Sequence, residues 1–288
     1  MLKSINKKDF DKYLDFAYSL ALDQKTSSYP TYTDGIKTKE DFTVHAKRGL
    51  NKKNHHILLF EYEKEIIGWI HYYVLEDDKL IAFEAFNIQH HSQIAFDEFI
   101  NYITPKYKNY KIHFGFPEVN CSATSYLKTR EFNLIEKSYV NILKLKNYTA
   151  KEEAENIIPV DKNNFTEFKK LHDNCGNMYW NSERLYEKII NPNEKSKWYI
   201  YLYYQNQKLT GNIYFICIND FMEIFGIDYI DKNFNPYVFK NLTIKALNKA
   251  KEINISHLYF FADKNEHLIL QELGFTHLGN YELYEKVL

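Results

Sequence analysis

The sequence predicts an α+β fold built from two similar halves, in each of which helices flank a mixed, mostly antiparallel sheet. Three pairs of short segments resemble each other and follow the same order in both halves: 67–72 with 210–215, 84–88 with 223–227, and 130–132 with 273–275. The paired segments lie 139 to 143 residues apart, close to half of the 288-residue chain. A repeat with this period indicates two copies of one domain.

The first half is expected to begin with two helices, because 9–22 places apolar side chains at helical spacing and Thr38 is a suitable N-cap for 38–50. Period-two patterns then predict strands, and an apolar face predicts a helix that ends near Pro105. The expected order after the first two helices is strands 57–62, 65–75 and 79–88, the helix ending near Pro105, strand 111–116, helix 123–130 and strand 133–145.

The second half repeats this order. Its longest helix has Asn235 as the expected N-cap and Pro236 at the first helical position. The expected elements are helices 165–174 and 182–190, strands 198–204, 208–217 and 221–230, helix 236–253, strand 257–261, helix 266–273 and strand 281–288. The sequence therefore predicts an N-terminal domain over 1–146, a polar linker over 147–156 and a C-terminal domain over 157–288.

Composition narrows the classes of partner. The net charge is −1, from 37 Lys+Arg against 38 Asp+Glu, which counts against nucleic acid or an anionic membrane as a partner. The longest apolar run, 198–204, is too short to span a bilayer, and the N-terminus does not resemble a signal peptide. We therefore expect a cytoplasmic protein with no membrane or nucleic-acid partner.

Cysteine and histidine spacing predicts no metal site. Cys121, Cys175 and Cys217 form no Cys-x-x-Cys pair, so neither a disulfide framework nor a zinc site is expected. The adjacent histidines at 55–56 and 90–91 would point to opposite faces of a strand, which does not suit shared ligation of one metal ion.

The element order resembles that of the GCN5-related N-acetyltransferase (GNAT) family, and the chain resembles a tandem of two such domains. This resemblance covers nearly all of the chain. It rests on the order of elements, on Leu-Gly-Phe at 273–275, and on the placing of Glu84 and Glu223 on the third long strand of each half.

The resemblance implies acetyl-CoA as co-substrate. In the family, the fourth and fifth strands splay apart and receive the pantetheine arm, and the start of the following helix binds the pyrophosphate through backbone N–H groups. A carboxylate on the fourth strand often acts as base. By this resemblance Glu223 is the expected catalytic base, with Glu84 as a less favoured counterpart. The implied cofactor-binding residues are Ile227, Asp228, Tyr229, Tyr237, Phe239 and Asn120.

Both halves depart from the family's pattern. Tyr237 and Phe239 occupy positions where the family has glycine, and both side chains would crowd a phosphate. In the first half two alignments stay open, with Gln89, Ser92 and Ile94 or with His90, Gln93 and Ala95 in the phosphate-binding pattern. Asn120 suits either a contact to pantetheine or an N-cap, and Leu127 replaces the family's Tyr, with Tyr126 beside it.

The leading interpretation is an N-acyltransferase that moves an acetyl group from acetyl-CoA to an amine of a small molecule or peptide. At most one half is expected to be active, and Glu223 favours the second. The alternative is a catalytically inactive GNAT-like binding or scaffold protein, in which Tyr237 and Phe239 fill the gap between strands 221–230 and 257–261. A third interpretation, an aminoacyl transferase that uses charged tRNA, is disfavoured by the net charge.

Overall fold

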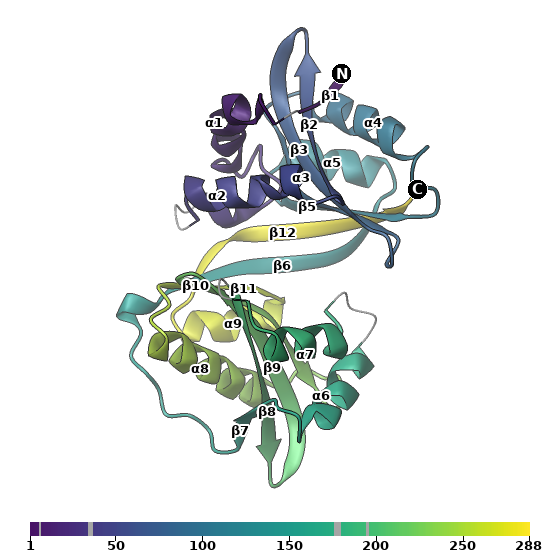
Figure 1. Ribbon diagram of the computed structural model, residues 1–288. Coiled ribbons are helices and arrows are strands. Elements are labelled where there is room, and N and C mark those ends of the chain that lie inside the picture. Colours follow the sequence, from purple (N-terminus) through teal and green to yellow (C-terminus); the bar gives the residue numbers. More distant parts are fainter. Residues whose placement is uncertain (6, 34–36, 176–179, 194–195) are drawn as a thin grey trace. The chain divides into compact units, whose positions relative to one another are not determined.

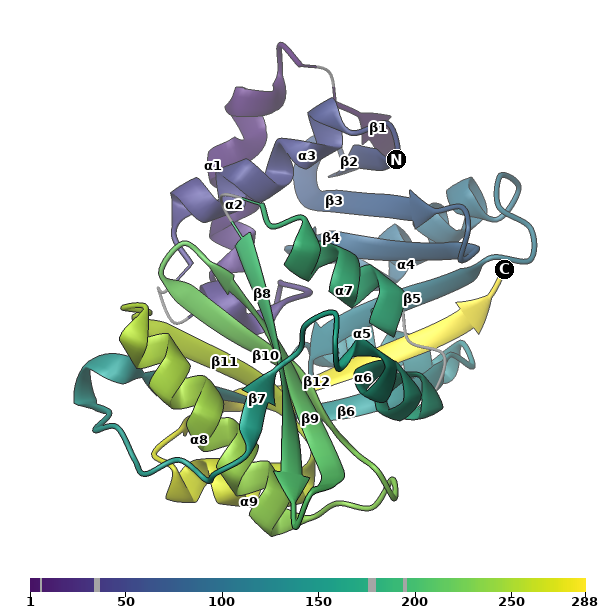
Figure 2. The same cartoon turned by 60° about the horizontal axis from the view of Figure 1, so that its bottom comes forward.

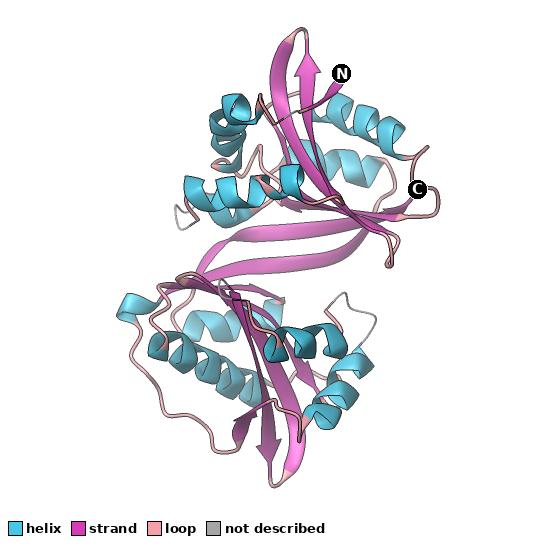
Figure 3. Cartoon of the chain, viewed as in Figure 1, coloured by secondary structure: helices cyan, strands magenta, loops and turns pink. Residues whose placement is uncertain are grey.

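The computed structural model describes residues 1–5, 7–33, 37–175, 180–193 and 196–288. The chain divides into two compact units (Figure 1). Unit 1 comprises Met1–Ser138 and Leu278–Leu288, and unit 2 comprises Tyr139–His277. Each unit contains parallel and antiparallel strands with helices on both faces, which confirms the predicted α+β class with two similar domains (Figure 3).

The sheet of unit 1 has the strand order β1-β2-β3-β4-β5-β12. Its strands before the last are β1 (Leu2–Ser4), β2 (His55–Tyr62), β3 (Glu65–Leu75), β4 (Leu80–Ile88) and β5 (Lys111–Pro117). Its helices are α1 (Phe10–Ala21), α2 (Lys39–Ala46), α3 (Arg48–Asn51), α4 (Ser92–Ile103) and α5 (Cys121–Thr129), with a short 3₁₀ helix η1 (Pro30–Tyr32). The first three α-helices cover one face of the sheet, and α4 and α5 cover the other (Figure 1).

The sheet of unit 2 has the order β6-β11-β10-β9-β8-β7. The strands after β6 are β7 (Ile157–Pro159), β8 (Ser196–Gln205), β9 (Lys208–Ile218), β10 (Phe221–Tyr229) and β11 (His257–Ala262). The helices are α6 (Phe165–His172), α7 (Ser182–Ile190), α8 (Pro236–Glu252) and α9 (Lys264–Glu272), with 3₁₀ helices η2 (Leu145–Asn147) and η3 (Asp173–Cys175). Helices α6 and α7 lie on one face, and α8 and α9 on the other (Figures 1 and 2).

The last strand of each predicted half lies in the sheet of the other unit. Strand β6 (Asn133–Lys144) runs on from unit 1, and its residues 139–144 pair antiparallel with β11. Strand β12 (Thr276–Val287) returns to unit 1, where residues 281–287 pair antiparallel with β5. The two units therefore differ from the predicted domains 1–146 and 157–288, because the halves exchange their closing strands.

Each sheet separates two hydrophobic cores. In unit 1, Phe96, Phe99 and Phe114 belong to a fully buried aromatic core beneath α4 and α5, and Phe10 and Trp69 belong to the core beneath α1. The apolar faces of α8 and β9 meet in a third core, with Leu242 and Phe215 both fully buried. Most of the Phe residues are thus core residues, whereas many of the Tyr residues are only partly buried.

Most predicted elements are present, with local differences in their bounds, among them the start of β12 at Thr276 instead of 281. The helix expected over 38–50 is two helices, α2 and α3, although Thr38 does cap α2 with Asp41. Helix α9 begins earlier than expected, because Asp263 forms a capping box with Glu266. The sequence pattern missed β1 and β7, which have three residues each. No described helix is long and apolar enough to cross a membrane.

Candidate functional site

In unit 1, strands β4 and β5 pair in parallel only at their beginnings. The pairs are Leu80 with Lys111 and Ile81 with Ile112, after which the two strands have no ladder between them. Residues 82–88 of β4 and 113–117 of β5 therefore border a splay. The chain continues from both strands into helices, so the starts of α4 and α5 lie at the wide end of this splay.

A pocket of ≈ 560 Å³ lies at these helix starts. Its lining comes from the entry and first turn of α4 and from the first turns of α5: His91, Ser92, Gln93, Ile94, Cys121, Ser122 and Ser125. The volume is within the range of small-molecule sites. The lining contains no Asp or Glu, so no carboxylate of the pocket wall opposes an anion.

The first N–H groups of both helices are not used by the described part of unit 1. His91, the N-cap of α4, has a left-handed backbone with φ 58° and gives no side-chain cap. The N–H groups of Ile94 and Ala95 donate to the His91 carbonyl, whereas those of Ser92 and Gln93 donate to no described residue. At α5, the N–H groups of Cys121 and Ser122 are likewise without an acceptor among the described residues. Two helix N-termini therefore present donors and positive dipole ends to one pocket.

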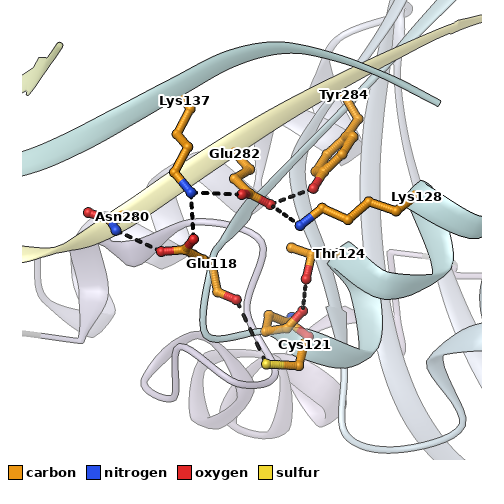
Figure 4. A network of polar contacts seen from close by, with 9 residues as sticks. Glu118, Cys121, Thr124, Lys128, Lys137, Asn280, Glu282 and Tyr284 are labelled. Carbon is orange, nitrogen blue, oxygen red and sulfur yellow. Dashed lines mark hydrogen bonds and ion pairs between the residues drawn. The ribbon is translucent and has the colours of Figure 1, made fainter. Parts of the chain in front are cut away.

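A polar network holds the start of α5 in place (Figure 4). Glu118, just before the helix, accepts a hydrogen bond of 2.6 Å from Asn280 Nδ2 and one of 2.5 Å from Lys137 Nζ. Glu282 on β12 contacts Lys137 at 3.2 Å and Lys128 at 3.1 Å. The Lys137 hydrogen bond lowers the pKa of Glu118, which keeps this carboxylate charged. The returning strand β12 thereby fixes the helix whose first turns line the pocket.

Asn120 is an N-cap whose side chain is fully engaged within unit 1. Its Oδ1 accepts from the N–H of Ala123 at 3.3 Å, and its Nδ2 donates to the carbonyl of Ser27 at 3.1 Å. The side chain is buried, with 4% of the residue exposed. The predicted N-cap role is therefore present, and the amide contacts the chain's own backbone.

The free edge of β4 in the splay is also occupied by the chain itself. The N–H of Phe86 donates to Ser28 Oγ at 2.8 Å, and the N–H of Ile88 donates to the carbonyl of Thr26 at 3.0 Å. Both groups lie on the edge that faces β5, since the N–H of Gln89 points to Ile67 on β3 and directions alternate along a strand. Residues 26–28 thus sit where an added strand would pair.

Unit 2 has the corresponding splay but a closed helix start. Strands β10 and β11 pair from Phe221–His257 to Ile224–Phe260 and then diverge. Asn235 Oδ1 accepts from the N–H groups of Tyr237 and Val238, each at 3.1 Å. The N–H of Phe239 donates to the Asn235 carbonyl, and Pro236 has no N–H. All four first positions of α8 are therefore without a free donor.

The two aromatic residues predicted at the start of α8 differ in burial. Tyr237 is 60% exposed, whereas Phe239 is fully buried, stacks on Phe260 at 5.7 Å and contacts Phe234. Phe239 belongs to the core beneath α8. Tyr237 is largely exposed and shares a side-chain hydrogen bond with Tyr203. The Asn235 cap and Pro236 already close the start of this helix.

Two of the three predicted residues on β10, Ile227 and Asp228, are engaged within unit 2. Ile227 is a core residue. Asp228 accepts from His172 Nδ1 at 2.6 Å and from Asn212 Nδ2 at 3.0 Å. Burial lowers the pKa of His172, but the hydrogen bond and charge of Asp228 outweigh this and raise it above its usual value. Tyr229 Oη is buried with no hydrogen-bond partner among the described residues, and burial raises its pKa.

The two candidate bases differ in their surroundings. Glu223 is half-buried and lies within the paired part of β10, opposite Tyr259 and Ile216. Glu84 bonds to Arg48 at 2.9 Å and contacts His45 at 3.4 Å. Burial raises the pKa of Glu84, but the hydrogen bond and charge of His45 and the charge of Arg48 lower it far below its usual range. A carboxylate held ionised in this way is a weak base at neutral pH.

The short helix of unit 1 offers no exposed tyrosine. Leu127 is fully buried, and Tyr126 Oη donates to Asp97 at 2.6 Å while its ring stacks on Phe96. Sequence reasoning missed Ser122 and Ser125 as pocket residues. Ser92, Gln93 and Ile94 did occur in the two open alignments of the phosphate-binding pattern. The predicted cap at Asn120 was the available signal that α5 begins beside the pocket.

Comparison with known proteins identifies the fold. No family model and no curated protein matches the sequence. A GCN5-related N-acetyltransferase from Sphaerobacter thermophilus has a TM-score of 0.66 and 10% identity, over 99% of this chain and 95% of that chain. A tandem GNAT protein from the clavulanic acid biosynthesis pathway has a TM-score of 0.60 and 8% identity, over 99% and 98% of the two chains.

A third solved structure agrees with these. A GNAT-family acetyltransferase from Colwellia psychrerythraea has a TM-score of 0.51 and 12% identity, over 99% of both chains. The chain has the GNAT fold, and the likeness to a tandem GNAT protein extends over nearly its full length.

Proposed function

We propose that unit 1 binds the pyrophosphate of acetyl-CoA and that the protein transfers the acetyl group to an amine of a small molecule or peptide. The observation that supports this most directly is the pocket in which two helix N-termini present unused N–H groups. This proposal moves the cofactor from the second half, which the sequence favoured, to the first.

The pocket fits the pyrophosphate by its donors. Ser92, Gln93, Cys121 and Ser122 supply backbone N–H groups, and Ser92, Ser122 and Ser125 supply hydroxyls around the same space. Neutral donors and helix dipoles bind phosphate without lysine or arginine. When bound, acetyl-CoA would supply the thioester carbonyl that an amine attacks.

Calorimetric titration of substitutions that add a carboxylate tests the site. Gln93→Glu and Ser122→Glu place negative charge in the first turn of α4 and α5, which favours each helix but repels a phosphate. We expect both changes to weaken acetyl-CoA binding by about tenfold or more, without a lower melting temperature. The matched control is Tyr237→Glu, which places the same charge in the first turn of α8.

Tyr237→Glu is expected to leave acetyl-CoA binding unchanged, because α8 offers no free donor. The opposite pattern, with loss in Tyr237→Glu alone, would return the cofactor to unit 2. No binding at millimolar acetyl-CoA by the unaltered protein would refute the proposal altogether.

A second candidate function is a GNAT-fold binding protein that holds CoA without transferring an acetyl group. The strong ion pairing of Glu84 and the engagement of Tyr126 with Asp97 favour this candidate. Release of free CoA in the presence of a panel of amines separates the two functions. Binding without thiol release would support the second candidate.

A further inference from the structure

Residues 26–28 form a turn that is anchored on the end of α1. The N–H groups of Thr26 and Ser27 donate to the Asp23 carbonyl, and Thr26 Oγ1 donates to the Leu20 carbonyl at 2.7 Å. Ser27 and Ser28 are 1% and 6% exposed, so the turn is part of the interior of unit 1.

The turn forms hydrogen bonds with two elements that border the splay, β4 and the start of α5. On β4 it accepts from the N–H groups of Phe86 and Ile88, and the Ser28 N–H and Oγ both donate to Asn87 Oδ1, at 2.9 and 3.2 Å. From the start of α5, Asn120 donates to the Ser27 carbonyl. These bonds leave the edge of β4 between Phe86 and Ile88 without a free donor.

An extended chain of amides pairs with a sheet through such an edge, as an added strand does. The β4 edge ends at Ile88, three residues before His91 at the pocket. An amide-bearing arm that continues from a pyrophosphate in the pocket into the splay therefore meets the N–H groups that residues 26–28 already occupy.

We propose that residues 26–28 compete within the molecule with the pantetheine arm for the edge of β4. The inference rests on the proposed binding of acetyl-CoA in unit 1. A ligand with the arm displaces the turn and breaks its bonds to Phe86, Ile88 and Asn120. A ligand that has only the pyrophosphate end binds the pocket without displacing it.

Two ligands and one substitution test this competition. The ligands are acetyl-CoA and 3′-phospho-ADP, which is CoA without its arm. Ser28→Ala removes the acceptor of the Phe86 N–H and so destabilises only the state in which the turn is in place. We expect acetyl-CoA to bind Ser28→Ala about tenfold more tightly than the unaltered protein, and 3′-phospho-ADP to bind both within twofold.

Ser27→Ala is the matched control, because Ser27 bonds to Asn120 through its carbonyl, which the change keeps. Within the described chain its hydroxyl contacts the Tyr29 carbonyl alone. Neither ligand should bind it differently. Asn120→Ser keeps a cap acceptor for α5 without adding charge beside the pocket but loses the amide donor to Ser27, so it should act like Ser28→Ala. This second variant keeps the competition testable if Ser28→Ala does not fold.

Hydrogen exchange gives an independent readout. Bound acetyl-CoA should speed exchange at residues 26–28, whereas 3′-phospho-ADP should not. Equal effects of Ser28→Ala on both ligands, or binding of acetyl-CoA with the turn still protected, would overturn the competition. If 3′-phospho-ADP and acetyl-CoA bind no variant, the proposed function fails and the competition with it.

Discussion

The carboxylate of Glu282 on β12 lies 3.2 Å from Nζ of Lys137 on β6, although 145 residues separate the two in the chain. Glu282 is 2% exposed and also contacts Lys128 and Tyr284. Burial raises the pKa of Glu282, but the bonds from Tyr284, Lys128 and Lys137 lower it below its usual value. This network joins the end of the chain to the part of unit 1 that carries the pocket.

Glu282→Gln should lower the free energy of unfolding of unit 1 by about 2 kcal/mol, because it removes a buried carboxylate and leaves two lysines without it. Urea titration measures the change. Because its folded pKa is depressed, this stabilisation should be present above the unfolded pKa of a glutamate and lost as the pH falls through the folded value. Glu285→Gln, in an ion pair on the same strand, should cost less than about 1 kcal/mol.

Removal of Leu278–Leu288 should unfold unit 1 and leave unit 2 largely intact. Strand β12 pairs with β5 over seven residue pairs and contributes the fully buried Tyr284 to the core beneath α5. Hydrogen exchange measures the effect, with loss of protection expected at Lys111–Pro117 and retention at His257–Ala262. Unchanged protection of β5 in the shortened chain would contradict the strand exchange.

Unit 2 should lose stability as the pH rises through the folded pKa of His172. This pKa is raised above 6.5 by Asp228, so the charged pair stabilises the folded state fully below 6.5 and ceases to do so once His172 deprotonates. His172→Gln should reduce this dependence. Melting temperatures of both proteins between pH 5.5 and about 8.5 measure it, and parallel curves for the two would argue against a stabilising charged pair.

Two substitutions on α8 should differ strongly in their effect on stability. Phe239→Ala removes a fully buried ring and should cost about 3–5 kcal/mol. Tyr237→Ala changes a 60% exposed side chain and should stay within about 0.5 kcal/mol. Urea titration compares them. Similar costs for both would mean that Tyr237 packs on unit 2.

Glu223→Gln tests whether the second half performs catalysis. If unit 1 holds acetyl-CoA, the rate of acetyl transfer should change by less than about twofold, whereas loss of a general base costs about 100-fold or more. The rate of CoA release from acetyl-CoA measures the effect. A large fall in rate with unchanged binding of acetyl-CoA would assign the base to Glu223.

Much of the fold could be predicted because its signals are local. Thr38 and Asn235 cap the helices that they were expected to cap, and the period-two patterns of β8 to β10 predict their strands. The repeat of 139 to 143 residues predicted two similar domains, and the chain does divide into two compact units. Short strands such as β1 have too few residues for a pattern to form.

The site was harder to predict because its donors are backbone N–H groups, and because the two helix starts that line it are far apart in the sequence. The start of α8 did have a signature, because Asn235 was its expected N-cap. Only the folded chain shows that His91 leaves the first N–H groups of α4 open, and that these groups share a pocket with the start of α5.

The sequence by itself determined the elements, their order and the twofold repeat, since hydrophobic period and capping act over a few residues. Tertiary structure alone decided which strands β6 and β12 pair with. The two strands have similar lengths, and the hydrophobic pattern of neither one predicts its neighbouring strand. It also decided which helix start faces a pocket and that residues 26–28 occupy the edge of β4. Those outcomes depend on hydrogen bonds between residues such as Ser28 and Phe86, 58 positions apart.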